Sequence, residues 1–426
     1  MTKKERIILF LLASINFTHI LDFMIMMPLG NYLMPYFHIS AKQFSFLVGA
    51  YTLSAAVSGF TAAFFVDKFD RKRVLLFGYI GFLAGTIACG FAPSYALLLQ
   101  ARIFAGIFGG LIGAQVMSIV ADLFGYERRG VATGAVMSSF AIAATLGVPF
   151  ALYLSNLSSW HAPFLLIGFL GIALIPFLIR YIPVVDGHLV KRENRVHRLH
   201  VLFTVFKNKQ QVLALLFSLL VMTGHFLIIP FVNPYLEFNK GFSKVQTPMV
   251  YLVGGIASFA SAILLGRLSD RVGKLKVFSV TVFLSFFAVG VITNLPSVSF
   301  YAVLGLFAVW FVLGTGRAVT GQAMISNVVT QQSRGSFMSF NSSMQQLGSA
   351  IAAFASGYIV FKTPTGKILH YEWVGYLSIL VLFLAFVLAR YLFAEIDKSP
   401  APILSHGIQG SEDLPVQSMV SSEIQS

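Results

Sequence analysis

The sequence predicts an all-α membrane protein of twelve transmembrane helices, arranged as two six-helix bundles related by an internal repeat. Three observations support this: the composition, the apolar segments, and residue matches at a constant offset. Of the 426 residues, 57% are hydrophobic and only 11% are charged, whereas a soluble domain carries about 25% charged residues. This is too few charged residues to cover the surface of a protein folded in water. The composition therefore indicates a protein that folds in a lipid bilayer.

Twelve apolar segments reach the roughly 20 residues that a helix needs to cross a bilayer. The first is interpreted as a retained helix, because its long apolar run lacks the small-residue cleavage site of a secretory signal. The segments are residues 7–30, 44–66, 74–92, 96–120, 131–154, 161–182, 211–236, 248–268, 277–295, 298–325, 335–361 and 373–394.

The positive charges predict the orientation of these helices. Lys and Arg collect on the cytoplasmic side of membrane proteins. If both termini are cytoplasmic, most of the 30 Lys and Arg residues lie on that side, whereas the outer loops hold only Lys42, Lys240, Lys244, Lys362 and Lys367. We therefore predict cytoplasmic N- and C-termini. The same loop distribution accounts for the net charge of +14 without nucleic acid as a partner.

The chain divides into two bundles and two polar segments. Residues 1–182 and 211–395 are the predicted six-helix bundles, and the basic stretch 183–210 is a cytoplasmic linker between them. The Ser-rich residues 396–426 have the composition of a disordered cytoplasmic tail.

Residues of the first bundle recur in the second at a nearly constant offset of about 205 positions, as expected for a duplicated unit. The matched pairs are Asp67 with Asp270, His19 with His225, Pro28 with Pro234, and Arg129-Gly130 with Arg334-Gly335. Such matches indicate parallel repeats related by an axis along the membrane normal.

Asp22 is the only acidic residue well inside a predicted span. A charge at mid-helix costs about 2.5–3.5 kcal/mol on insertion scales, so such residues are rare and usually functional. Loss of hydration disfavours the charged form of a carboxylate, which makes Asp22 a candidate proton carrier. The alternative is an Asp22 neutralised by a neighbouring helix, for example by Arg102, with no transport role.

Asn16, His19, Asp22 and Met26 follow one another at three- and four-residue steps, which places them on one helix face. We interpret this face as lining a central cavity, with His19 as a proton relay one turn from Asp22. Together with His225 these side chains include transition-metal ligand types. Lone histidines inside membranes are more often hydrogen-bonded structural groups, so neither a metal nor a cofactor is predicted.

Arg102 and Arg317 lie inside spans, away from the cytoplasmic ends where the other basic residues of the spans are found. Arg102 is expected to face the cavity and to act on Asp22 or a substrate anion, the alternative being hydrogen bonds to backbone carbonyls. Arg317 is also assigned to the cavity, although its spacing does not match Arg102 under the repeat. Neutral hydrogen-bonding residues of the second bundle complete the predicted cavity: Asn233, Asn341 and Gln345.

Four local motifs carry a resemblance to a known family. Residues 266–274 read Gly-x-x-x-Asp-Arg-x-Gly-Lys, and the first-bundle copy of this loop keeps Asp67, Lys68, Arg71 and Lys72. The fourth span reads Arg-x-x-x-Gly-x-x-Gly-Gly over 102–110, with Ala105 at a position that is usually polar. The fifth span contains Leu-Gly-Val-Pro at 146–149. With these motifs, nearly all of residues 1–395 resemble the major facilitator superfamily, near the drug:proton antiporter and sugar-efflux-like branch.

The resemblance implies the major facilitator fold and a multi-pass transporter of the cell (inner) membrane that works as a monomer. It assigns gating roles to the loop residues: Asp67 and Asp270 would accept hydrogen bonds from a helix N-terminus of the opposite half, next to Arg271. Arg71 is expected to pair with Asp122. Gly147 and Pro149 mark a helix kink or a tight helix contact.

The expected function is proton-coupled efflux of a small organic molecule, a drug or metabolite, by alternating access. Proton-coupled or facilitated uptake is the alternative, and a non-transporting receptor or scaffold is a remote one. An enzyme is not expected, because the sequence lacks HExxH, nucleophile-elbow and phosphate-loop motifs. The substrate stays open among lipophilic cations, sugars, amino acids and neutral antibiotics.

Overall fold

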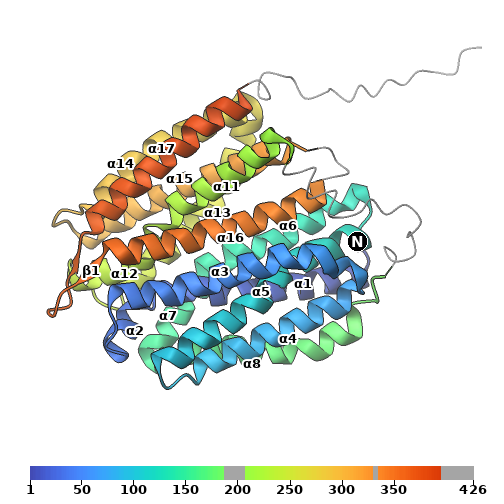
Figure 1. Cartoon of the computed structure of the whole chain (residues 1–426), viewed down its shortest axis with the longest axis horizontal. Coiled ribbons are helices and arrows are strands. Elements are labelled where there is room, and N and C mark those ends of the chain that lie inside the picture. The colour runs from blue at the N-terminus through green and yellow to red at the C-terminus, as the bar shows by residue number, and fades with distance from the viewer. Residues whose placement is uncertain (187–206, 330–333, 395–426) are drawn as a thin grey trace, which may run out of the picture.

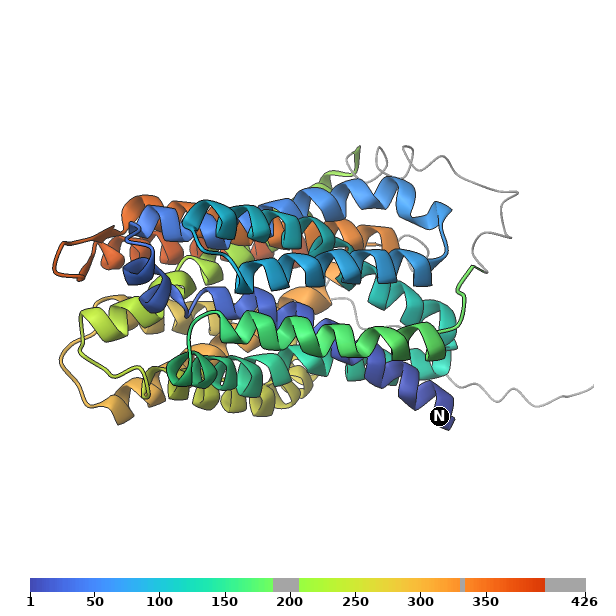
Figure 2. The same ribbon diagram turned by 90° about the horizontal axis from the view of Figure 1, so that it is seen from below.

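The computed structural model describes residues 1–186, 207–329 and 334–394, which form two helical bundles lying side by side (Figure 1). Most of the predicted linker and the whole of the predicted tail lie outside these ranges. The N-terminus and a small β-hairpin lie at opposite ends of the molecule (Figure 2). We call these the N-terminal end and the hairpin end.

The first bundle contains eight α-helices with a 3-10 turn and a π-helical turn between them. They are α1 (Lys3–Met26), α2 (Gly30–Tyr36), α3 (Ala41–Phe65), η1 (Val66–Lys68), α4 (Arg71–Gly90), α5 (Tyr95–Leu123), α6 (Tyr126–Ile142), η2 (Ala143–Gly147), α7 (Val148–Leu157) and α8 (Ala162–Tyr181).

The second bundle has the same order of long helices and adds the hairpin. Its elements are α11 (Lys209–Phe226), α12 (Ile229–Phe238), α13 (Thr247–Val272), α14 (Lys274–Thr293), α15 (Phe300–Ser326), α16 (Arg334–Ile359), β1 (Phe361–Lys362), β2 (Ile368–Leu369) and α17 (Tyr371–Phe393). The antiparallel β1–β2 pair was not expected from the sequence.

Within the described residues, eleven helical segments are long and apolar enough to cross a membrane. The remaining predicted span, α16, is 26 residues long but more polar. This helix packs along α3 and α11 inside the assembly (Figure 1). Its Ser, Asn and Gln side chains therefore meet protein on those sides, which explains its lower hydropathy.

Three predicted spans are interrupted near proline, which cannot donate a backbone hydrogen bond. Span one breaks between α1 and α2 at Pro28, and span seven breaks just before Pro230. In span five a π-helical turn, η2, precedes Pro149, where the sequence indicated a kink. A side chain at Gly147 would also lie only 2.8 Å from Leu21 of α1, so this position is a tight helix contact as well.

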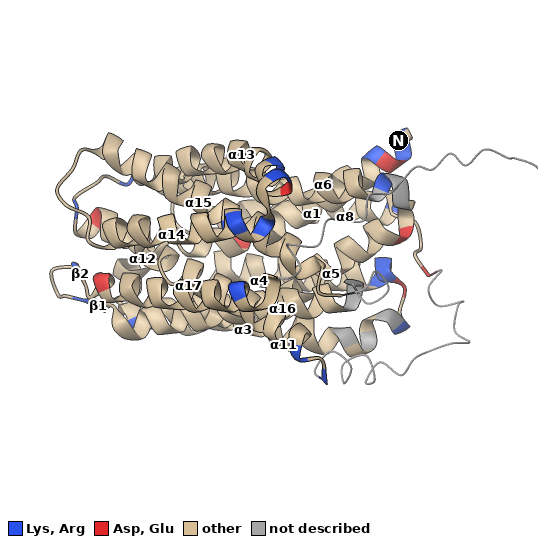
Figure 3. Ribbon diagram, turned by 90° about the horizontal axis from the view of Figure 1, so that it is seen from above, with Lys and Arg blue, Asp and Glu red and all other residues tan. Residues whose placement is uncertain are grey.

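Charged residues concentrate at the two ends of the bundles, with Lys and Arg gathered toward the N-terminal end (Figure 3). Each half has its own apolar core, and a third core spans both halves toward the hairpin end. The orientation of these ends relative to the cytoplasm stays a prediction from the charge pattern.

Candidate functional site

A buried ion pair joins α1 to α5. Arg102 Nη1 lies 2.7 Å from Asp22 Oδ2, and both side chains are completely buried. The sequence left open whether Asp22 faces a cavity or is neutralised by Arg102. The structure shows the second arrangement, so in this conformation neither residue lines an open chamber, and the expectation that both do is wrong for this state.

The ion pair is only partly satisfied. Asp22 Oδ1 and Arg102 Nε and Nη2 have no hydrogen-bond partner among the described residues. The guanidinium lies over the ring of Tyr51 at 4.2 Å. On α4, Thr86 interacts with Asp22 and Cys89 with Arg102, although Thr86 Oγ1 is too far away or poorly aligned for a full hydrogen bond. Buried charges need several good partners to offset their loss of hydration, so this pair retains unmet hydrogen-bonding capacity.

His19 belongs to the same cluster, one turn before Asp22 on α1. Its ring packs edge-on against Phe82 at 5.5 Å and lies 6.5 Å from the ring of Tyr51. Neither ring nitrogen has a hydrogen-bond partner within the described ranges. His19 is therefore positioned beside the ion pair without being fixed by a polar contact.

Glycines of the third and fourth spans bring α5 against its neighbours at backbone distance. A Cβ at Gly106 would lie 2.4 Å from the carbonyl oxygen of Tyr51, and one at Gly85 would lie 2.7 Å from the backbone of Ala105. Small residues permit such close approach in membranes. There is no room for a larger side chain at Ala105, which explains the residue found there.

The second half buries its own arginine, on α15. Arg317 is 1% exposed, and its Nη2 lies 3.3 Å from Nδ1 of His225 on α11. Trp310 stacks on the same imidazole at 5.1 Å. Among the described residues no carboxylate pairs with Arg317, and its Nη1 and the Trp310 Nε1 have no partner.

Aromatic rings connect the two arginine clusters across the interface between the halves. Tyr51 stacks with Phe23 at 6.0 Å, and Phe23 meets Phe226 of the second half at 5.6 Å. Phe226 in turn packs edge-on against His225 at 5.4 Å. The clusters are thus neighbours through four rings, although they belong to different halves.

The other predicted cavity residues do not join these clusters. Asn16 donates to Ser139 Oγ on α6 at 2.7 Å, and Met26 is fully buried in the shared core. The remaining three are dispersed: Asn233 donates to the Pro28 carbonyl, Asn341 accepts from Ser218, and Gln345 donates to Gln322. The expectation of one cavity lined by all of them is wrong for this conformation, because their hydrogen bonds go to different parts of the molecule. Among the described residues only Asn233 Oδ1 of this set is buried without a partner.

The structure brings Arg71 and Asp122 together, with Nε and Oδ2 2.6 Å apart. Asp270, by contrast, is 72% exposed and pairs with Lys274 four residues on, so the expected contact with the opposite half is not made here. Arg271 is exposed nearby. Asp67 falls in η1, but its side chain lies outside the described part of the chain.

Sequence reasoning missed the contacts that join the halves at the hairpin end. Asn156 of α7 donates to the Lys244 carbonyl at 2.8 Å and accepts from the Tyr32 hydroxyl at 2.6 Å. The Lys244 ammonium lies 4.3 Å from the Tyr32 ring centre, and Asn233 reaches the Pro28 carbonyl at 3.2 Å. The signal available in the sequence was the presence of Asn side chains, Asn156 and Asn233, in spans that are interrupted near proline.

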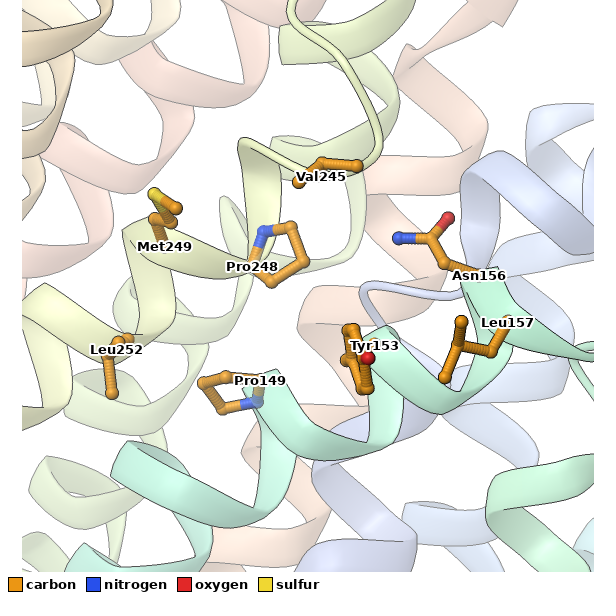
Figure 4. Close-up of a pocket in the computed structure, with 8 residues that line it drawn as sticks. All are labelled: Pro149, Tyr153, Asn156, Leu157, Val245, Pro248, Met249 and Leu252. Atoms are coloured by element: carbon orange, nitrogen blue, oxygen red, sulfur yellow. The ribbon is translucent and has the colours of Figure 1, made fainter.

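An apolar groove of about 430 Å³ runs between α7 and α13 (Figure 4). Its lining residues are Pro149, Tyr153, Asn156, Leu157, Val245, Pro248, Met249 and Leu252. None of them is charged, so this groove lacks groups that would recognise an ion. No three His, Cys, Asp or Glu side chains in the described ranges come together as metal ligands, and His19 and His225 lie in separate clusters.

Comparison with known proteins identifies the family. The sequence profile of the Major Facilitator Superfamily matches residues 12–320. An uncharacterised MFS-type transporter, YceJ of Bacillus subtilis (strain 168), is 24% identical over 92% of this chain and 96% of its own length. A probable sugar efflux transporter of Mannheimia succiniciproducens is 20% identical over 69% of this chain and 71% of its own length.

A solved structure has the same fold. The inward-facing, unoccupied structure of a bacterial homolog of the human lysosomal transporter Spinster matches with a TM-score of 0.73 at 15% identity, and it covers 94% of this chain and 100% of that one. The profile covers well over half of the sequence, and the helical architecture agrees with it. The chain therefore belongs to the major facilitator superfamily, as a multi-pass secondary transporter and not an enzyme.

Proposed function

We propose that this transporter exports a small organic molecule in exchange for protons, with Asp22 as the proton carrier and Arg102 as its reversible partner. The observation that supports this is the completely buried ion pair with unmet hydrogen-bonding capacity on both side chains. An ion pair kept only for stability would be worth little, since well-packed apolar residues often replace such pairs without loss. Protonating Asp22 would remove the attraction and release Arg102.

The contacts at the hairpin end suggest which step of the cycle is observed. They join the halves there, whereas at the N-terminal end the ion pair of Asp270 among the described residues is with Lys274 of its own half. With the N-terminal end in the cytoplasm, this state is closed to the outside. A paired, deprotonated Asp22 in this state fits proton release inward, and proton uptake would follow once the hairpin end opens.

Proton exchange supplies enough energy for useful export. One proton moving inward yields about 2.3 kcal/mol per 100 mV, and about 1.4 kcal/mol corresponds to a tenfold ratio. One proton per neutral molecule therefore supports a ratio of roughly fortyfold from 100 mV alone. Leu146–Pro149 resembles a motif of proton-coupled exporters in this superfamily, and this resemblance and the probable sugar efflux relative favour the outward direction.

The test is transport by purified protein in liposomes, with a substrate chosen from the export profile of a deletion strain. A pH gradient should drive flux of the wild type against the substrate gradient. Asp22→Asn should abolish this coupling but keep substrate exchange at equal pH, because the two halves can still rock. Glu372→Gln, which removes a half-buried carboxylate at the hairpin end, is the matched control and should stay coupled.

Two results would overturn the proposal. Full proton coupling in Asp22→Asn would show that another group carries the proton. Substrate accumulation driven by acid outside, with the substrate moving in the same direction as the protons, would show a symporter and reverse the proposed direction.

A further inference from the structure

Arg317 is a buried cation that no described acidic residue neutralises. Arginine stays protonated in proteins, and an uncompensated buried charge is costly. Arg102 meets this cost with Asp22, but Arg317 contacts only a neutral imidazole through Nη2, and its Nη1 has no partner. Because Arg317 is only 1% exposed, a negative group from outside the described residues would stabilise it.

The side chains in contact with Arg317 leave hydrogen-bond donors unused. A guanidinium only donates, so Nδ1 of His225 accepts from Arg317, and the imidazole proton is on Nε2. Trp310, stacked on the same imidazole, has an indole N–H without a partner. Arg317, His225 and Trp310 thus form one contact group, joined by the Nη2–Nδ1 contact and the ring stacking. Within the described residues Arg317 Nη1 and Trp310 Nε1 are donors without an acceptor, which is the complement of an anion.

This donor cluster adjoins the interface between the halves. His225 and Phe226 are only partly buried, and Phe226 packs against Phe23 of the first half. Position 314 is a glycine, and a Cβ there would lie 3.2 Å from the His225 ring and 3.7 Å from Arg317 Nη2. Gly314 therefore places no side chain over the cluster. Because the cluster lies next to the interface between the halves, rocking of the halves would change access to it.

We propose that Arg317, His225 and Trp310 bind the carboxylate of the transported molecule, and that the substrates are organic monocarboxylates with an apolar body. One guanidinium balances one negative charge, and a planar carboxylate matches its geometry. The aromatic rings of Phe226 and Trp310 suit an aliphatic or aromatic remainder. A second charge on the ligand would have no described partner. Naming this substrate class rests on the proposed transport function, whereas the binding site itself does not.

The experiment measures equilibrium binding through the fluorescence of Trp310. The chain has three tryptophans, so Trp160→Phe with Trp373→Phe leaves Trp310 as the reporter. Monocarboxylates from acetate to octanoate, benzoate and phenylacetate are titrated at neutral pH, each against its neutral amide. Inorganic phosphate and anionic lipid vesicles are titrated in parallel, because they offer negative charge without this organic acid.

At least one carboxylate should bind saturably, with its amide about tenfold to a hundredfold weaker, the range expected for losing a charge-assisted hydrogen bond. Arg317→Gln should weaken the acid by a similar factor and leave the amide unchanged. His225→Gln should cause a smaller loss, and it provides a second variant if Arg317→Gln does not fold. Arg390→Gln, an exposed cation on α17, is the matched control.

Equal binding of acid and amide, binding of phosphate or lipid alone, no saturable response to any carboxylate, or unchanged affinity in both variants would each overturn the proposal. The outcome is separable from the proton mechanism because binding needs no gradient. If Asp22→Asn stays coupled, the proton mechanism fails, and the result for Arg317 is unaffected.

Discussion

Each half of the molecule buries one arginine on corresponding helices, α5 and α15, but the two are treated differently. Arg102 has a carboxylate at 2.7 Å, whereas Arg317 has a neutral imidazole at 3.3 Å. The charges of Asp22 and Arg102 cancel, and under the proposed mechanism the pair separates when Asp22 takes up a proton. The charge of Arg317 is not balanced by any described acidic residue, and we propose that a ligand balances it. The repeat kept the helical scaffold, and we propose that it divided proton and anion chemistry between the two halves.

The largest effect that tests this difference is expected from Arg102→Met. It strands Asp22 as a buried, unpaired charge, which costs about 3–5 kcal/mol when one partner of a buried pair is removed. Asp22→Leu combined with Arg102→Met should recover most of the loss, because two apolar residues replace the pair. Thermal and denaturant unfolding in detergent measure both. A double variant as unstable as the single one would show that Arg102 stabilises α5 through something other than Asp22.

A smaller loss of about 1–3 kcal/mol is expected from Gly106→Ala, since overpacking forces the surrounding structure to shift. The added methyl would lie 2.4 Å from the Tyr51 carbonyl oxygen and push α5 away from α3. Gly113→Ala on the same helix is the control, because nothing lies within 4 Å of its Cβ position. It should be neutral or stabilising by up to about 1 kcal/mol. Equal unfolding midpoints for the two variants would contradict close α3–α5 packing.

Arg317→Met should change the stability of the ligand-free protein by no more than about 1 kcal/mol. The lost hydrogen bond to His225 is worth about 0.5–1.5 kcal/mol, and removal of an unpaired buried charge offsets it. Unfolding of Arg317→Met, measured under the same conditions as Arg102→Met, compares the two halves directly. If Arg317→Met is as damaging as Arg102→Met, Arg317 has a strong partner within the protein and its cluster is not an open site.

The sequence was sufficient for the long helices because bilayer thickness and backbone hydrogen bonding leave few alternatives. Helix ends fall within a few residues of the predicted ones, for example at Tyr371–Phe393 for 373–394. The sequence did not predict α2, α12 or the β-hairpin as separate elements, because they are short and lie near the ends of spans. Sequence patterns alone do not contain the tertiary contacts that fix them.

The site was predicted in its residues more than in its contacts. Asp22, Arg102 and Arg317 stood out because charges inside spans are expensive. Which side chains meet depends on how each helix is rotated and how deep it lies, and the repeat did not reveal this. The position that matches Arg102 under the offset is Phe307, so the pairing of Arg317 with His225 could not be anticipated. Helical periodicity likewise grouped Asn16 with Asp22, although Asn16 bonds to α6.

The smallest expected effect concerns the loops at the N-terminal end. Asp270→Asn removes a mostly exposed pair with Lys274 at 3.4 Å, and such surface pairs contribute about 0–1 kcal/mol. Asp122→Asn removes the closer 2.6 Å contact with the largely buried Arg71 and should lower the unfolding midpoint more. Unfolding curves of the two variants, measured under the same conditions, show which loop's ion pair contributes more to stability. An Asp270→Asn protein as destabilised as Asp122→Asn would mean that the second-half loop is held as firmly as the first. The halves would then differ in their buried arginines but not in their loops.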